Sequence, residues 1–202
     1  MKSRNSHCPA RTIRRVIAAW VVLACTGFGT PAFATAEPRR VEGIAFARQV
    51  QVDGRDLPLR GLGLLRYLVF IKAYVAALYL PEAVRAEDAL GEVPRHLEIE
   101  YFHAIAAEDF AKATTAAIER NTSLVTFRRL EPTITSFNAL YRDVKPGDRY
   151  ALTYVPGAGT TLSWNGVPLG TIPGAEFAAG LFGIWLGPNP LDRDLKRLLL
   201  DD

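Results

Sequence analysis

The segment Arg66–Leu80, RYLVFIKAYVAALYL, is the longest apolar stretch after residue 34 and restricts the possible folds most strongly. In a β-strand alternate side chains point to opposite faces, so both faces of this strand would be apolar. Lys72 is the only charged residue in its interior. A strand of this kind must be covered on both sides. We therefore predict one strand over Arg66–Leu80, with helices on one side and another element on the other; a buried helix is the alternative.

Other segments show the alternation of strands, and turn residues separate them. Asp53-Gly54 and Asn165-Gly166 are typical of tight hairpin turns, which join antiparallel neighbours. The predicted strands are Val41–Val52, Leu57–Gly63, Leu97–Phe102, Arg149–Val155, Thr160–Trp164 and Val167–Ile172.

Helical periodicity occupies the middle and the end of the chain. The first predicted helix covers Glu108–Arg120, and the second begins at Glu131-Pro132, with proline in its first turn. Ala175–Leu186 is apolar nearly all round and is therefore expected to be buried, whereas Leu191–Leu200 is amphipathic. This order of strands and helices predicts an α+β fold, with a large antiparallel sheet and a helical layer on one face.

Residues 1–34 have the pattern of a secretory signal peptide. A basic start precedes the apolar run Val16–Ala24, which is too short to span a bilayer. Ala32-Phe33-Ala34 then provides small residues for cleavage, which we predict after Ala34. Cys25 ends a sequence that resembles a lipoprotein box, so lipid anchoring there is an alternative, and a buried N-terminal helix is another. We expect the mature protein in the periplasm.

Composition after residue 34 excludes several classes of protein. Residues 1–34 hold five of the 24 basic residues and no acid, so the remaining 168 residues have a net charge of −2. This balance argues against nucleic acid as a partner. Cys8 and Cys25 both precede residue 35, so cysteine chemistry is not expected in the mature chain. We predict a flexible leader over residues 35–40 and one domain over 41–202, monomeric and without a transmembrane span.

Four motifs resemble those of a known family. Ile71–Leu80 (IKAYVAALYL) is similar to the central strand of the chalcone isomerase-like proteins. Lys145–Asp148 (KPGD), Trp164–Gly166 (WNG) and Gly183–Gly187 (GIWLG) resemble later motifs of its exported bacterial branch. The resemblance covers residues 41–200 and implies an open-faced β-sandwich with a ligand cleft between sheet and helices. The family includes plant enzymes that close chalcones to flavanones and non-catalytic relatives that bind fatty acids.

The resemblance also implies candidate ligand-binding residues. Arg66 stands where the family has its cleft arginine, and a guanidinium can hold a carboxylate or phenolate by two hydrogen bonds. Tyr74 matches a cleft threonine of the plant enzymes. On one regular strand Arg66 and Tyr74 would share a face. A surface role for Arg66 at a strand end, and a core role for Tyr74 with its hydroxyl bonded to the backbone, are the alternatives.

Two further positions depart from the plant enzymes. Phe110 stands where the resemblance places their catalytic tyrosine, and Ala117 where it places an asparagine. Losing one such hydrogen-bond donor typically costs roughly 2.7–4 kcal/mol of transition-state stabilisation. We therefore expect no efficient chalcone isomerase activity, and we expect Phe110 and Ala117 to line a cleft suited to a lipid.

No residue pattern indicates a metal or a cofactor. His96 and His103 are the only histidines after residue 34, and neither belongs to a ligand motif. The favoured function is an exported protein that binds a small hydrophobic acid, similar to a fatty acid, in its cleft. The alternatives are an intramolecular lyase or isomerase acting on a phenolic or related molecule, and a structural or interaction protein of the envelope with a vestigial cleft.

Overall fold

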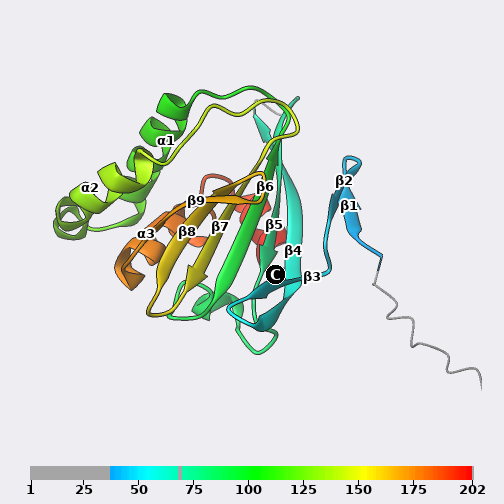
Figure 1. Ribbon diagram of the computed structural model, residues 1–202, viewed down its shortest axis with the longest axis horizontal. Helices are drawn as coiled ribbons and strands as arrows, with labels where there is room; N and C mark the ends of the chain where they lie inside the picture. The colour runs from blue at the N-terminus through cyan, green and yellow to red at the C-terminus, as the bar shows by residue number, and fades with distance from the viewer. Residues whose placement is uncertain (1–36, 68–69, 202) are drawn as a thin grey trace, which may run out of the picture. The chain divides into compact units, whose positions relative to one another are not determined.

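The computed structural model describes residues 37–67 and 70–201. The described residues belong to one compact unit that contains every described helix and strand (Figure 1). Their buried apolar side chains form two hydrophobic clusters. The predicted signal peptide, with its two cysteines, lies outside the described residues. Among the helices that are described, none is both long and apolar enough to cross a membrane.

Seven strands form one antiparallel sheet in which each strand pairs with the next along the chain (Figure 1). Short turns can join antiparallel neighbours. Two connections are longer: residues 80–94 between β5 and β6, which hold a 3-10 turn, and the one between β6 and β7, which holds two helices. The strands are β3 (Gln49–Val52), β4 (Arg55–Tyr67), β5 (Ile71–Tyr79), β6 (Arg95–Tyr101), β7 (Arg149–Val155), β8 (Gly159–Trp164) and β9 (Val167–Ile172). The predicted α+β class and antiparallel sheet are confirmed.

The prediction of one strand over Arg66–Leu80 is wrong, because this segment is the end of one strand and the whole of the next. β4 ends at Tyr67, β5 begins at Ile71, and these two residues pair with each other. Hairpin turns usually contain Gly, Asn, Asp or Pro, and none of these occurs between Tyr67 and Ile71. The uninterrupted apolar run therefore hid the reversal of the chain.

The predicted strand Val41–Val52 is likewise divided. β1 (Arg39–Val41) and β2 (Ile44–Phe46) form a separate two-stranded hairpin. Only the last residues of the predicted strand belong to β3. The hairpin turns at Glu42-Gly43, where both residues have positive φ (52° and 83°). β1 begins inside the stretch predicted as a flexible leader.

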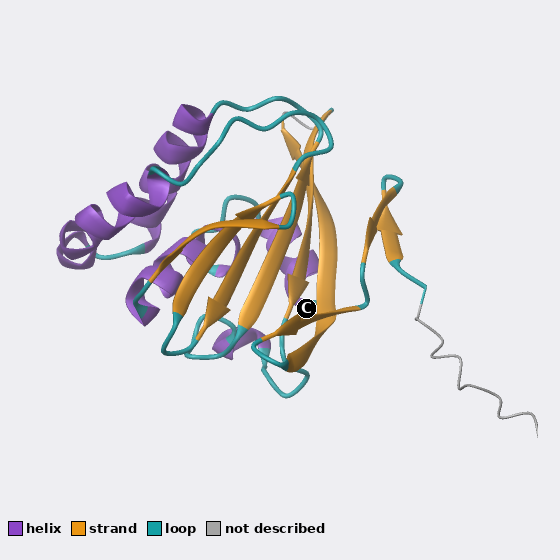
Figure 2. Cartoon of the chain, viewed as in Figure 1, coloured by secondary structure: helices purple, strands orange, loops and turns teal. Residues whose placement is uncertain are grey.

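Four α-helices lie on one face of the large sheet (Figure 2). They are α1 (Ala107–Asn121), α2 (Leu124–Asn138), α3 (Ala175–Leu186) and α4 (Arg193–Leu200), and a 3-10 turn covers Ala86–Asp88. The predicted start of the second helix at Glu131-Pro132 is wrong. Ser123 caps α2 by accepting a hydrogen bond from the Thr126 amide (3.1 Å), so Pro132 lies inside the helix.

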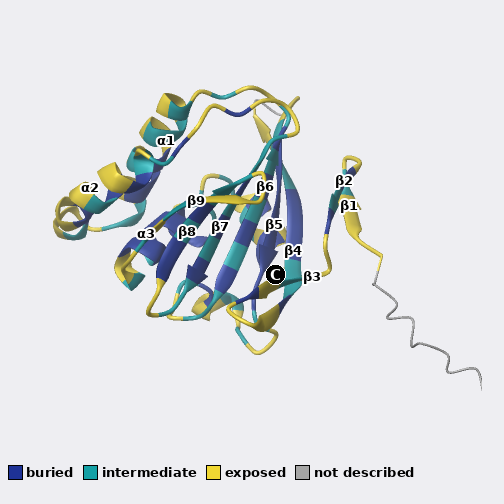
Figure 3. Cartoon of the chain, viewed as in Figure 1, coloured by how far each residue is buried: buried dark blue, intermediate teal, exposed yellow. Residues whose placement is uncertain are grey.

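β5 is buried on both faces, as its composition requires (Figure 3). Tyr74 and Leu78 face the helices, where the larger hydrophobic cluster lies. Val75 and Tyr79 face the opposite side, in a smaller cluster with side chains of β1–β2, β3 and β4. The sequence predicted that some element covers the face of the strand opposite the helices. The hairpin β1–β2 is part of that element.

α4 packs directly on the backbone of β4. A Cβ atom at Gly61 would overlap the carbonyl oxygens of Leu198 and Leu199, and one at Gly63 would lie 2.8 Å from Cδ1 of Leu195. Only glycine permits this close approach. This close packing fixes the position of α4 on β4.

Substituting Gly61→Ala is expected to lower the free energy of unfolding by about 1–3 kcal/mol, because the added methyl group separates α4 from β4. Gly183→Ala in α3 is the matched control, since its added Cβ would lie 3.7 Å from the nearest atom and alanine favours helices. Urea unfolding measures the free energy of unfolding of the two variants and of the wild type. Equal stability of the Gly61→Ala protein and the wild type would contradict the close packing.

Candidate ligand-binding site

A cavity of about 440 Å³ lies between the helical layer and one end of the sheet. Pockets that bind small molecules commonly measure about 300–1,000 Å³. Its walls come from β5, β6, α1, α3 and the loops beside them. The lining residues are Ala73, Tyr74, Tyr101, Ile105, Asp109, Phe110, Ala113, Thr114, Ala116, Ala117, Arg120, Tyr141, Ile184, Trp185 and Leu191.

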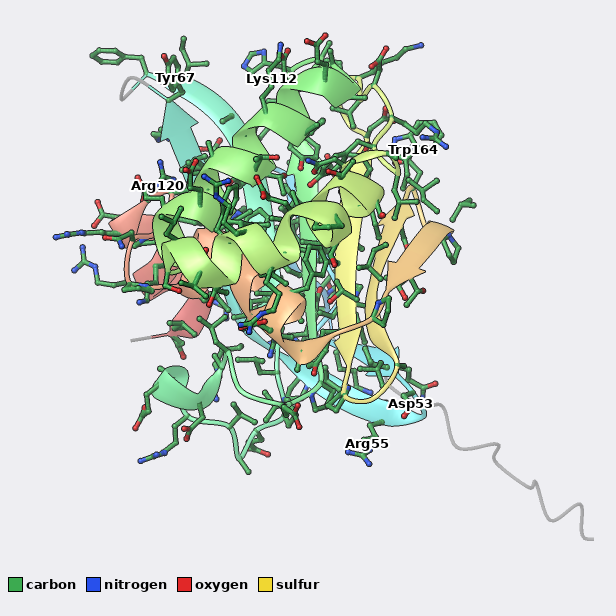
Figure 4. All side chains as sticks on the ribbon, turned by 90° about the vertical axis from the view of Figure 1, so that its left-hand side faces the viewer. Asp53, Arg55, Tyr67, Lys112, Arg120 and Trp164 are labelled. Atoms are coloured by element: carbon green, nitrogen blue, oxygen red, sulfur yellow. The ribbon has the colours of Figure 1, made fainter. Side chains whose placement is uncertain are left out.

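α1 provides the longest wall of the cavity. Phe110, Ala113, Ala117 and Arg120 recur at helical spacing and therefore share one face. The two alanines leave space where longer side chains would reach the sheet. Figure 4 shows Arg120 near the end of the helix, well separated from Lys112. The wall is thus apolar along most of its length and ends in a cation.

Hydroxyl groups from the sheet, from α1 and from the loop after α2 also line the cavity. The Trp185 indole Nε1 donates a hydrogen bond to the Tyr74 hydroxyl (2.9 Å), which leaves the Tyr74 O–H proton available. Thr114 and Tyr141 share one hydrogen bond (2.8 Å), so one hydroxyl proton of this pair is also available. The Tyr101 hydroxyl makes no hydrogen bond with any other described residue. The cavity therefore offers uncharged donors to a polar group.

Burial raises the pKa of Tyr74, Tyr101 and Tyr141 above the ordinary value of 10.0 for tyrosine, because a phenolate is poorly solvated in the interior. The nearby carboxylate of Asp192 further raises the pKa of Tyr74. These hydroxyls consequently remain protonated donors throughout the physiological pH range.

Phe110 packs inside an aromatic cluster. Its ring centroid lies 5.2 Å from those of Tyr101 and Tyr150, edge to face, and 5.3 Å from that of Tyr141, stacked. Such contacts stabilise the packing of aromatic rings. Phe110 therefore anchors α1 to the sheet, and it presents no hydroxyl to the cavity.

The rim near Arg120 is held by a pair of amide groups. The Asn121 side chain donates to the Asn189 carbonyl (2.9 Å) and accepts from the Asn189 amide (3.0 Å). This pair fixes the loop after α3, which carries Leu191, against the end of α1. Asn121 thus holds the rim of the cavity in place through two hydrogen bonds.

The structure brings three of the four predicted site residues together. Tyr74, Phe110 and Ala117 line the cavity, whereas Arg66 does not. The Arg66 guanidinium instead contacts the Glu42 carboxylate (3.3 Å), in the turn of β1–β2 on the other side of the sheet. The expectation that Arg66 and Tyr74 share a face is wrong for two reasons. The two residues lie on different strands, and the pairing of these strands shifts register between Leu65 and Arg66.

The cation that does reach the cavity is Arg120, which sequence reasoning treated only as the end of a helix. Its position, ten residues after Phe110 on the same helical face, was a usable signal. Trp185 lies in Ala175–Leu186, which the sequence predicts only as a buried helix. Its hydrogen bond to Tyr74 depends on how α3 packs, so no sequence pattern indicated it.

No group of three or more His, Cys, Asp or Glu side chains within residues 37–67 and 70–201 is placed to hold a metal ion. His96 shares a hydrogen bond through Nδ1 with the Thr153 hydroxyl (2.8 Å).

The chain belongs to the chalcone isomerase-like family, whose model matches residues 38–201. The crystal structure of a fatty-acid binding protein from Arabidopsis thaliana has a similar fold, with a TM-score of 0.62 and 14% sequence identity. The similarity covers 79% of this chain and 92% of the plant chain. No curated protein matches the chain significantly in sequence.

Replacing Tyr101→Phe tests whether the cavity hydroxyls are held protonated. In the unfolded chain a tyrosine ionises near pH 10.0, whereas in the folded chain its raised pKa keeps the proton bound. The resulting contribution to stability is complete below about pH 10 and is lost as the pH rises further. Urea unfolding should therefore show a smaller alkaline loss of stability in the variant. Identical losses would contradict the burial of this hydroxyl.

Proposed function

We propose that the protein binds a small hydrophobic acid, similar to a fatty acid, in the cavity beneath α1. The observation that carries the proposal is an apolar cavity of about 440 Å³ with buried, uncharged hydroxyl donors inside and one cation at its rim. The name of the structurally similar plant protein, which states fatty-acid binding, supports the same class of ligand.

The two charged groups of the cavity determine the orientation of an acid. Asp109 and Arg120 both line it and lie eleven residues apart on α1, which corresponds to about 16 Å along the helix. A carboxylate is repelled by Asp109 and attracted by Arg120. Tyr74 lies on the Arg120 side, because its hydroxyl is bonded to Trp185 of α3. Gly183, two residues before Trp185, packs against Asn121, the residue after Arg120.

The carboxylate would therefore contact the Arg120 guanidinium and accept the free proton of the Tyr74 hydroxyl. The Trp185 bond to the Tyr74 oxygen orients that proton away from the indole. The tail would lie along Ala117, Ala113 and Phe110, where burial of apolar surface contributes about 25 cal/mol per Å². This arrangement moves the cationic role from Arg66, which the sequence predicted, to Arg120.

Fatty-acid titration of residues 36–202 tests the arrangement. Arg120→Gln is expected to weaken binding about tenfold, the scale of a lost charged hydrogen bond. Arg66→Gln is the matched control and should bind as the wild type does, because Arg66 pairs with Glu42 outside the cavity. Ala117→Trp should abolish binding by filling the space, with circular dichroism confirming its fold. Absence of binding in the wild type would favour the vestigial cleft instead.

We also infer that the protein does not close chalcones efficiently. Phe110 has no hydroxyl and Ala117 has no amide, so two polar groups expected of the plant enzymes are missing from the wall of α1. Chalcone absorbance in the presence of the purified domain should decay at the rate found in buffer. A faster decay that Tyr101→Phe removes would identify a ring-closing enzyme with a different donor.

Export to the periplasm is the remaining part of the proposal. It rests on the basic start, the apolar run Val16–Ala24 and the small residues before Thr35. The mass of the intact polypeptide isolated from cells should correspond to a chain that begins at Thr35. A lipid adduct on Cys25 would indicate the lipoprotein alternative.

A further inference from the structure

The turn between β4 and β5 is unusual in its composition. Five apolar residues, YLVFI, occupy positions 67–71 between Arg66 and Lys72, where hairpins usually have Gly, Asn, Asp or Pro. Among the described ones, Tyr67 is 63% exposed, Phe70 87% and Ile71 44%. We call these three residues the apolar tip.

The apolar tip protrudes from the molecule. Figure 4 shows Tyr67 projecting beyond the end of β4, on the side of the view opposite Trp164. Tyr67, Phe70 and Ile71 belong to neither hydrophobic cluster of the described residues. A run of exposed apolar side chains costs hydration free energy, and where it is present it commonly marks a surface for a partner.

Cations flank the apolar tip at its base. Arg66 and Lys72 each have side chains 44% exposed, and both contact the single carboxylate of Glu42, at 3.3 Å and 2.7 Å. The three groups together keep one net positive charge directly behind the apolar side chains. Aromatic residues at the front with cations behind match the order of acyl chains and anionic headgroups at the surface of a lipid bilayer.

We propose that the apolar tip docks on the surface of a bilayer that contains anionic lipids. Tyr67 and Phe70 enter the interfacial region, Ile71 follows them, and Arg66 and Lys72 contact the lipid phosphates. A narrow, protruding hairpin fits a deformable lipid surface better than the flat or grooved surface of a protein.

The apolar tip adjoins the cavity. Ala73 lies two residues after Ile71 on β5 and is part of the cavity wall. Docking at this end would place the cavity beside the membrane. The proposal does not rest on fatty-acid binding, because attachment to vesicles without added acid is measured separately.

Co-sedimentation with vesicles tests the docking, using residues 36–202 and either phosphatidylcholine alone or phosphatidylcholine mixed with phosphatidylglycerol. The wild type should bind the mixed vesicles more strongly. Phe70→Asp should weaken this binding about tenfold or more, because the ring loses its burial and the new charge is repelled. Val167→Asp is the matched control: Val167 is 60% exposed at the β8–β9 hairpin, and its replacement should leave binding unchanged.

A second variant gives a direct reading. Phe70→Trp keeps an aromatic side chain at the apolar tip, and its fluorescence should shift to shorter wavelength when mixed vesicles are added. The proposal is overturned if the wild type binds neither kind of vesicle, or if Phe70→Asp and Val167→Asp bind equally. It is also overturned if the wild type is a dimer that Phe70→Asp converts to a monomer without vesicle binding, since the tip would then join two copies.

Discussion

β5 has no polar face, and the arrangement of the whole domain depends on this constraint. Its side chains alternate between a cluster beneath the helices and a cluster beneath β1–β2 and β3. A strand in such a position must be covered twice, and a single layer of helices covers it only once. The hairpin β1–β2 supplies part of the second cover, together with β3, although it forms a sheet of its own.

The cavity follows from an imbalance of side-chain size across the same interface. The sheet presents tyrosines, Tyr74 and Tyr101, whereas α1 presents Ala113 and Ala117. Phe110 fills the space at one end of the helix by packing among tyrosine rings, and the small residues leave it open further along. Buried hydroxyls that are not fully bonded to protein remain inside this space, which suits a ligand with one polar end.

Much of the fold was predictable, because binary patterning and turn chemistry act locally. The helix Ala175–Leu186 and the hairpin at Asn165-Gly166 were located correctly, since an apolar helix and an Asn-Gly turn each have strong local signals. The hairpin before Ile71 was missed because its turn lacks such residues. In the site, Tyr74 was placed by its strand, but Arg66 was misplaced, because the face on which a strand residue lies depends on register and bulges.

The hydrogen bond between Trp185 and Tyr74 has a practical consequence. Indole emission responds to hydrogen bonding and to the polarity around the ring, and this indole lies in the cavity wall. The only other tryptophan in the described residues, Trp164, lies on β8 and is not part of the cavity lining. The protein thus has a built-in optical reporter, with which occupancy of its interior can be followed without any attached dye.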